Sequence, residues 1–383
     1  MQASKVDRVK SSKTRRVFLV ASYISDWVIL VVAAAVGYVL GNITPNRRPF
    51  NLDDREISFP LSPKETVTTT VLVLVSVVAP VAVVFLVCLI FVPGPTTPKG
   101  IPRALRWRRK LWELHIGWLS LALSVVGAWF ITSSMKNLFG KPRPDLLARC
   151  QPDLSRAASY LVGGFRDGFQ DGQLVSAAIC RNTDKATLDE GFRSFPSGHS
   201  SISAAGLIYL SLFVASKFAI AIPFLAPARD HETDLQLSAF PSRSFVDPAA
   251  SSLTQLGSRA IEDPATGCTS HHTTVSAVRR RAAAPPLYLL VIAIIPFFAA
   301  IFIASTRWYD FRHHGFDILF GFGIGTVTAF FSFRYYHLPI RQGAGWAWGP
   351  RNEEKAFWAG LGSQSYATCK RLDTWAGEGR GVV

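Results

Sequence analysis

Residues 194–225 read SFPSGHSSISAAGLIYLSLFVASKFAIAIPFL, a short polar turn followed by a long apolar run. A helix needs about 20 consecutive apolar residues to cross the hydrocarbon core of a bilayer. The run at residues 201–225 has that length, although Lys217 and Pro223 interrupt it. The stretch therefore predicts a membrane-spanning helix that begins directly after a turn rich in hydroxyl groups.

Other apolar stretches of this kind lie at residues 17–40, 67–92, 114–135, 287–305 and 316–333. The whole chain of 383 residues is 49% hydrophobic and only 17% charged, whereas ordinary soluble domains have roughly 25% charged residues. Buried helices of a soluble protein are the alternative, but six segments with few internal charges argue against it. We therefore expect an all-α, polytopic membrane protein with a bundle of six transmembrane helices.

The chain is strongly basic, because 41 Lys and Arg against 26 Asp and Glu give a formal net charge of +15. Such a charge fits nucleic acid, anionic lipid or a phosphorylated substrate. Basic residues interleaved with aromatics on a soluble domain are missing from the sequence, which argues against nucleic acid. We expect the partners to be the bilayer and a phosphorylated molecule.

The distribution of positive charge predicts the orientation of the spans. Lys and Arg cluster in residues 1–16 and again in the short loop 93–113, so both segments are expected to be cytosolic. An even number of spans then places the tail 335–383 in the cytosol as well. The predicted core, 17–334, contains a cytosolic insertion at 226–286 that is rich in Ser, Thr and Ala and is expected to be disordered. An endomembrane, such as that of the vacuole, fits this arrangement.

Three polar segments stand at the ends of predicted spans. They are residues 136–145 after the third span, 194–200 before the fourth, and 306–317 between the fifth and the sixth. Because successive spans run in opposite directions, all three segments must lie on the same side of the membrane. The orientation given above makes that side lumenal or extracellular.

The side chains in these segments predict a phosphate cradle. Lys136, Arg143 and Arg307 provide three positive charges, and the forked donors of a guanidinium match phosphate oxygens. Ser197 and Gly198 lead into a helix, where free backbone N–H groups and the helix dipole would hold a further oxygen.

Two histidines add the chemistry of a nucleophile and an acid. Asp317 follows His313 by four residues, one helical turn, so its carboxylate is expected to hold one imidazole nitrogen and leave the other free to attack phosphorus. His199 would protonate the leaving group and then activate water. The three cations would stabilise the charge that magnesium stabilises elsewhere, and the segments contain no carboxylate cluster, so we expect no metal and no cofactor.

The same residues resemble the PAP2 superfamily of membrane phosphatases, whose signatures are KxxxxxxRP, PSGH and SRxxxxxHxxxD. Here they read Lys136 to Arg143-Pro144, Pro196 to His199, and Thr306-Arg307 to His313 to Asp317. Thr306 in place of Ser is the only departure. The resemblance implies a PAP2-type bundle in which His313 is the nucleophile, His199 the acid and Asp317 its orienting partner, with Lys136, Arg143, Ser197, Gly198 and Arg307 binding phosphate without magnesium.

The stretches RPDLLARCQPD and GFRSFPSGHSS resemble fungal diacylglycerol pyrophosphate phosphatases within the lipid phosphate phosphatases. That resemblance implies substrates such as phosphatidate, lysophosphatidate and diacylglycerol pyrophosphate. A sphingoid-base or polyprenyl phosphate phosphatase, or a headgroup transferase that uses an alcohol instead of water, remains an alternative. A transporter or degenerate scaffold of the same fold is a further alternative, which the intact His199 and His313 disfavour.

Two more residue groups carry structural expectations. Cys150 and Cys180 share the loop between the third and fourth spans on the motif side, where an oxidising compartment would favour a disulfide over two free thiols. Asp26 is a lone carboxylate inside the first span, and we expect it to form a hydrogen bond within the bundle.

Overall fold

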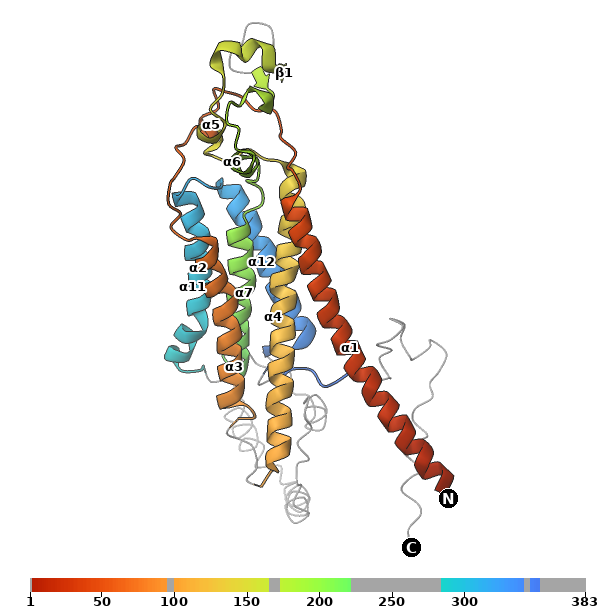
Figure 1. Ribbon diagram of the computed structural model, residues 1–383. Helices are drawn as coiled ribbons and strands as arrows, with labels where there is room; N and C mark the ends of the chain where they lie inside the picture. The colour runs from red at the N-terminus through yellow and green to blue at the C-terminus, as the bar shows by residue number, and fades with distance from the viewer. Residues whose placement is uncertain (1, 95–99, 165–172, 222–283, 341–344, 352–383) are drawn as a thin grey trace, which may run out of the picture. The chain divides into compact units, whose positions relative to one another are not determined.

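The structure is a computed structural model that describes residues 2–94, 100–164, 173–221, 284–340 and 345–351. Six helical segments in this part of the chain are long and apolar enough to cross a membrane. They are α1 (Gln2–Asn42), the continuous segment formed by α2 (Thr69–Val73), the π-helical η2 (Leu74–Val78) and α3 (Ala79–Phe91), α4 (Arg103–Phe139), α7 (Gly198–Lys217), α11 (Leu287–Tyr309) and α12 (Gly315–Tyr336) (Figure 1). The predicted class, an all-α multi-pass membrane protein, is confirmed.

Helix α7 ends earlier than we expected from the apolar run at residues 201–225. It ends at Lys217 because Ala219 adopts a left-handed conformation, with φ of 53°, and the chain turns back on itself. The Ile220 N–H donates to the Ala215 carbonyl over 2.8 Å, the bond that closes a helix terminus of the Schellman type. Backbone geometry, not hydropathy, sets this boundary.

Helix α4 is longer than predicted. The basic stretch that we expected in a loop at residues 93–113 is helical from Arg103 onward. Pro102 precedes the helix with φ of −54°, a value already suited to a helix start. Lys and Arg are good helix formers, so the positive cluster extends the helix beyond its apolar part.

Helix α7 lies among the other helices of the compact unit that comprises residues 32–348. It packs against α4, α11 and α12, and α3 packs against both α4 and α7 (Figure 1). Two glycines permit backbone contact: a Cβ on Gly206 would lie 1.7 Å from the Ser76 carbonyl oxygen in η2, and one on Gly325 would lie 2.2 Å from that of Ser201. The beginning of α7, where the second motif lies, is therefore held tightly against α12.

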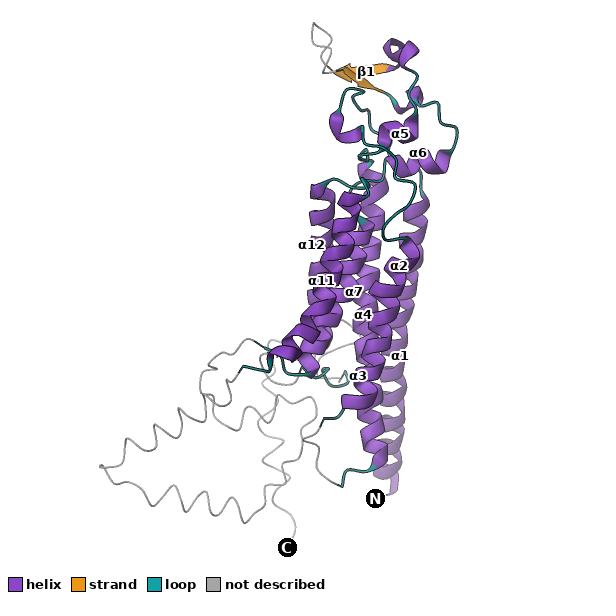
Figure 2. Cartoon of the chain, turned by 90° about the vertical axis from the view of Figure 1, so that its left-hand side faces the viewer, coloured by secondary structure: helices purple, strands orange, loops and turns teal. Residues whose placement is uncertain are grey.

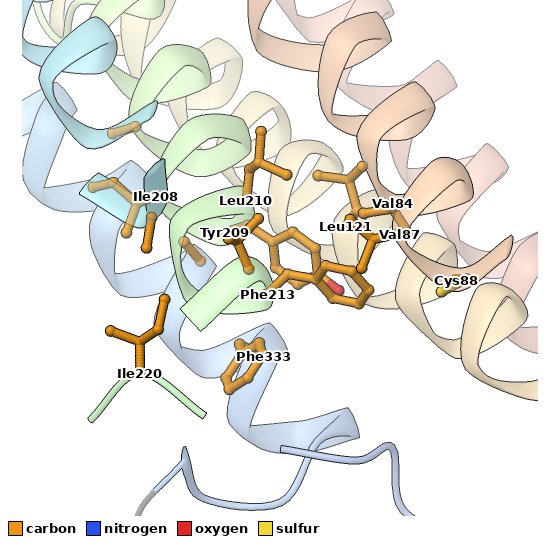
Figure 3. Close-up of a cluster of buried hydrophobic side chains, with 14 of the residues drawn as sticks. Val84, Val87, Cys88, Leu121, Ile208, Tyr209, Leu210, Phe213, Ile220 and Phe333 are labelled. Carbon is orange, nitrogen blue, oxygen red and sulfur yellow. The ribbon is translucent and has the colours of Figure 1, made fainter. Parts of the chain in front are cut away.

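The main hydrophobic cluster fills the part of the bundle around the later turns of α7. Phe213 and Tyr209 of that helix are fully buried at its centre. Side chains from α3, α4 and α12 surround them, and Figure 3 labels Val84, Val87, Cys88, Leu121, Ile208, Leu210, Ile220 and Phe333 of this cluster. The apolar core thus occupies the bundle away from the polar motif segments.

The segment between α4 and α7 forms a cap beyond the motif end of the helices, as Figure 2 shows for α5, α6 and β1. Its elements are α5 (Leu146–Cys150), η3 (Leu154–Tyr160), the antiparallel strands β1 (Leu161–Gly164) and β2 (Gln173–Val175), η5 (Ala177–Ile179) and α6 (Lys185–Gly191). A second hydrophobic cluster joins Leu146 and Phe192 of this cap to Phe50 in the connection between α1 and α2. A disulfide bond joins Cys150 to Cys180 in the same cap.

At the opposite end, residues that we expected in the tail 335–383 belong to the helical unit, which extends to Trp348. The carboxylate of Glu113 is fully buried, pairs with Lys217, and accepts a hydrogen bond of 3.0 Å from the Ala347 N–H. Residues 341–344 and 352–383 of the predicted tail, and the insertion apart from residues 284–286, lie outside the described residues.

Of the described residues, 2–31 and 349–351 form a separate unit. Within it, Asp26 accepts a hydrogen bond from Arg351, whose guanidinium also lies over the ring of Tyr23 at 4.5 Å. Asp26 is thus hydrogen-bonded as expected, but its partner follows the last helix in sequence instead of lying within one of the spans.

Candidate active site

The structure brings the three motif segments together at one end of the helices. The residues are Lys136 in the last turn of α4, Arg143 in the loop that follows, Ser197 at the N-cap of α7, Gly198 and His199 in its first turn, Arg307 in the last turn of α11, His313 in the next turn and Asp317 in the first turn of α12. Backbone contacts join the segments: the Ser197 N–H donates to the Asp317 carbonyl over 3.0 Å, and that of Ser194 donates to the Lys141 carbonyl over 3.1 Å.

His313 is buried with an exposed fraction of 2%, and its Nδ1 lies 2.6 Å from the Ser194 carbonyl oxygen. A carbonyl only accepts, so Nδ1 carries the hydrogen and Nε2 keeps its lone pair. Burial, and next the charges of Arg143 and Lys136, hold the pKa of His313 well below its ordinary value of 6.5. The imidazole is therefore neutral, the form required of a nucleophile.

Asp317 does not hold His313 directly, which corrects the expectation drawn from their spacing. Its Oδ1 accepts from Lys141 Nζ over 2.8 Å, and its Oδ2 accepts from the Ser194 hydroxyl over 2.5 Å and the His314 N–H over 3.2 Å. The spacing argument fails because α12 begins at Gly315, so His313 lies before the helix and Asp317 caps its first turn. Ser194 links the two: its hydroxyl binds Asp317 and its carbonyl binds His313.

His199 and Ser197 lie at the start of α7. The Nε2 atom of His199 lies 3.2 Å from the Val67 carbonyl oxygen, which fixes a hydrogen on Nε2 in this contact. The Ser197 hydroxyl caps the helix by accepting from the Ser200 N–H at 3.5 Å. A Cβ on Gly198 would lie 3.5 Å from Lys136 Nζ, so that ammonium faces the beginning of α7.

The two predicted phosphate-binding arginines are buried beside carboxylates. Arg143 and Arg307 each have exposed fractions of 2%; Arg143 pairs with Glu190, and Arg307 Nη1 lies 3.2 Å from Glu65 Oε2. Neither Nε atom has a hydrogen-bond partner among the described residues. A buried guanidinium N–H without an acceptor is costly, so both arginines retain a donor suited to an oxyanion.

Glu190 lies among several cations of the site. Burial alone would raise the pKa of its carboxyl group, but Arg143, Lys136 and Arg193 together lower that pKa to about 2. Burial in turn lowers the pKa of Arg143 from its ordinary value. The site carries a surplus of positive charge, as a pocket for phosphate requires.

Sequence reasoning missed Lys141, Ser194, Glu65, Glu190 and Arg312. Lys141, Ser194 and Arg312 lie inside the three motif segments, at positions where the motif pattern specifies no residue. Glu65 lies 242 positions from its partner Arg307, and no local pattern marks such a contact. Among the described residues, no group of three His, Cys, Asp or Glu side chains could hold a metal ion.

Residues 117–341, more than half of the chain, match the model of the PAP2 superfamily, and the chain belongs to that superfamily. No solved structure matches the chain significantly.

Several curated proteins resemble this chain. A probable diacylglycerol pyrophosphate phosphatase 1 of Schizosaccharomyces pombe is 32% identical over 50% of this chain and 59% of its own length. Diacylglycerol pyrophosphate phosphatase 1 of Saccharomyces cerevisiae is 24% identical over 83% of this chain and 80% of its own. A PA-phosphatase related-family protein of Dictyostelium discoideum is 33% identical over 52% and 53%. The chain thus spans little more than half the length of two of these relatives.

Proposed function

We propose that the chain is an integral membrane phosphatase that hydrolyses phosphomonoesters or pyrophosphate of lipids, such as phosphatidate, lysophosphatidate and diacylglycerol pyrophosphate. The observation that carries the proposal is a buried, neutral His313 among Arg143, Arg307 and Lys136 at the end of apolar helices. A site at the membrane surface suits a substrate whose acyl chains stay in the bilayer. The names of the relatives from both yeasts agree with this substrate class.

In the first step, the cations and the backbone N–H groups at the start of α7 bind the phosphoryl oxygens. The Nε2 lone pair of His313 attacks phosphorus, a P–N bond forms, and the bond between phosphorus and the lipid oxygen breaks. Protonated His199 gives its proton to that oxygen, so the lipid leaves as a neutral alcohol, or as a monophosphate when the substrate is a pyrophosphate.

In the second step, neutral His199 takes a proton from water while the water oxygen attacks phosphorus. The P–N bond breaks, its electrons return to His313, and inorganic phosphate leaves. His199 is again protonated and His313 again neutral, so the cycle closes on protein groups and water alone. The charge that develops on the phosphoryl oxygens is stabilised by fixed cations.

The orientation also belongs to this proposal. Basic residues at the start of α4 and at the N-terminus favour the cytosol for the end away from the motifs. The active site would then face the lumen or the cell exterior, where the disulfide of the cap is chemically stable.

The proposal is tested with the full-length chain purified in detergent containing EDTA. Inorganic phosphate should be released from phosphatidate and diacylglycerol pyrophosphate by the wild type, and not by His313→Ala. Complete loss on chelation that magnesium restores would contradict the metal-free steps. Release of inorganic phosphate only from sphingoid-base or polyprenyl phosphates would show that the substrate class is wrong. Transfer of the phosphoryl group to an added alcohol would show that water is not the only acceptor.

A second measurement separates the two histidines. An aryl phosphate expels a stable anion that needs little protonation, so His199→Ala should still become phosphorylated on His313 and then hydrolyse slowly. We expect an acid-labile, base-stable phosphoenzyme in His199→Ala and none in His313→Ala. A label that persists without His313 would contradict its role as nucleophile.

A further inference from the structure

The segment Glu65–Val67 forms one side of the site, although it lies outside the three motif segments and outside the residues that match the family model. The N–H and hydroxyl of Thr66 donate to the two carboxylate oxygens of Asp310 over 2.9 and 2.7 Å. The Val67 carbonyl contacts His199 at 3.2 Å. These contacts fix the position of the neighbouring Glu65 side chain beside the site.

The Glu65 carboxylate bridges two arginines, Arg307 and Arg312, that precede His313 in the sequence. Its Oε2 lies 3.2 Å from Arg307 Nη1, and its Oε1 lies 2.9 Å from Arg312 Nη2. Arg307 belongs to the proposed phosphate cradle, whereas Arg312 directly precedes His313 and has no part in the proposed steps. The guanidinium of Arg312 is therefore held next to that of Arg307 by one shared carboxylate, and the proposed steps do not use it.

The other carboxylates near the two arginines lie farther away and already have partners. Asp145 lies 3.8 Å from Arg312 and holds Arg149 through two hydrogen bonds of 2.9 and 2.8 Å. Asp310 lies 3.7 Å from Arg307 and accepts two hydrogen bonds from Thr66. The Arg312 side chain is only 11% exposed, and the buried Nε atoms of Arg312 and Arg307 have no partner within the described parts of the chain. One Glu65 carboxylate thus faces two guanidinium groups that each retain a free donor.

The geometry assigns Arg312, together with Arg307 as a residue shared by both phosphoryl groups, to a second oxyanion subsite that would hold the second phosphoryl group of a diphosphate, with Glu65 as an internal anion that this group displaces. A carboxylate that bridges two guanidinium groups occupies the position that phosphoryl oxygens would take. Glu65 is 27% exposed, so it reaches solvent while both guanidinium groups stay buried. The assignment rests on the proposed function, since it concerns phosphorylated substrates.

The subsite predicts that removing the charge of Arg312 and removing the charge of Glu65 have opposite effects on diphosphate binding. A monophosphate bound by Arg143, Lys136 and Arg307 has no group that reaches Arg312. A diphosphate uses Arg312 and must compete with Glu65. Removing the charge of Arg312 should therefore weaken diphosphate binding alone, and removing the charge of Glu65 should strengthen it.

The test measures binding by calorimetry on the full-length protein in detergent with EDTA. The probes are inorganic phosphate and methylenediphosphonate, a diphosphate analogue that cannot be hydrolysed. Arg312→Gln should weaken methylenediphosphonate binding roughly tenfold and change phosphate binding by less than about threefold. Glu65→Gln should tighten methylenediphosphonate binding several-fold. Arg55→Gln and Glu56→Gln, exposed in η1 (Arg55–Ile57) of the same connection, remove matching charges and should change neither affinity.

Equal losses for both probes in Arg312→Gln, or no gain in Glu65→Gln, would overturn the subsite. Arg312→Lys keeps the positive charge without the fork, so it covers the case in which Arg312→Gln does not fold; it should weaken the diphosphonate selectively but less. Binding is measured instead of turnover. A wild type that prefers the diphosphonate yet hydrolyses no lipid phosphate would refute the proposed function and leave the subsite standing.

Discussion

At the scale of single residues, the partner of His313 defines the chemistry. A carboxylate would stabilise an imidazolium, whereas the Ser194 carbonyl fixes the Nδ1–H tautomer and adds no full negative charge. The surrounding cations act in the same direction and hold the pKa of His313 well below its ordinary value. The nucleophile is consequently neutral across the physiological pH range, and acid loss of activity is not expected to arise from its protonation.

Ser194 also predicts how Asp317 acts. Ser194→Ala keeps the carbonyl bound to His313 but removes the hydroxyl that binds Asp317, and Asp317→Asn removes the charge that this hydroxyl and Lys141 bind. If both changes break one chain of contacts, each should lower kcat by about tenfold or more, and the double variant should be no worse than the poorer single variant.

The measurement is a double-mutant cycle on kcat, with Ser134→Ala on α4 as a control, because its hydroxyl binds the Phe130 carbonyl in its own helix. If the two losses of kcat multiply in the double variant, Asp317 acts on His313 by a route that does not pass through the Ser194 hydroxyl. Ser194 and Asp317 are positioning residues here, so KM should change less than kcat.

At the scale of helices and loops, hydropathy located the spans and their alternation placed the motifs at one end. It could not give the side-chain partners. The spacing of His313 and Asp317 suggested a single helical turn, but the helix boundary falls between them, at Gly315. A backbone carbonyl is available at every residue, so no pattern singled out Ser194, and the pair of Lys141 and Asp317 spans 176 positions.

Helix packing predicts a contrast between two glycines of α12. A Cβ on Gly325 would lie 2.2 Å from the Ser201 carbonyl in α7, whereas one on Gly323 would meet nothing within 4 Å. Gly325→Ala should therefore push α12 away from the motif end of α7, lower stability by about 1–3 kcal/mol and reduce activity. Gly323→Ala should stabilise by roughly 0.5–1 kcal/mol, because alanine favours the helix.

Thermal unfolding in detergent and phosphate release are both measured for these variants. A Gly325→Ala protein as stable and active as Gly323→Ala would show that α7 and α12 do not need backbone contact.

At the scale of the whole molecule, buried histidines couple folding to pH. His337, at the end of α12, is fully buried, with its ring stacked on Phe333 at a centroid distance of 4.8 Å. Burial, and next the charge of Lys217, hold its pKa well below 6.5, and the nearby Phe333 carbonyl opposes this only in part. His313 is shifted in the same direction.

The sign of the effect follows from proton counts. Below 6.5, the ordinary pKa of a histidine, the unfolded chain binds protons that the folded chain does not, so stability is complete above that pH and is lost as the pH falls. Neither ring nitrogen of His337 makes a hydrogen bond of normal geometry with a described residue. His337→Phe keeps the aromatic packing, so it should raise stability by roughly 1–2 kcal/mol near neutral pH.

The same variant should lose less stability than the wild type between about pH 7.5 and about pH 5.5, because one of the buried histidines that resist protonation in the folded chain is gone. Thermal unfolding at both pH values measures the difference. His115→Phe, which replaces a partly exposed histidine on α4, should keep the acid sensitivity of the wild type. If His337→Phe is as acid-sensitive as the wild type, the buried ring of His337 is not a source of the pH dependence, which then arises from other groups, such as His313, that resist protonation in the folded chain.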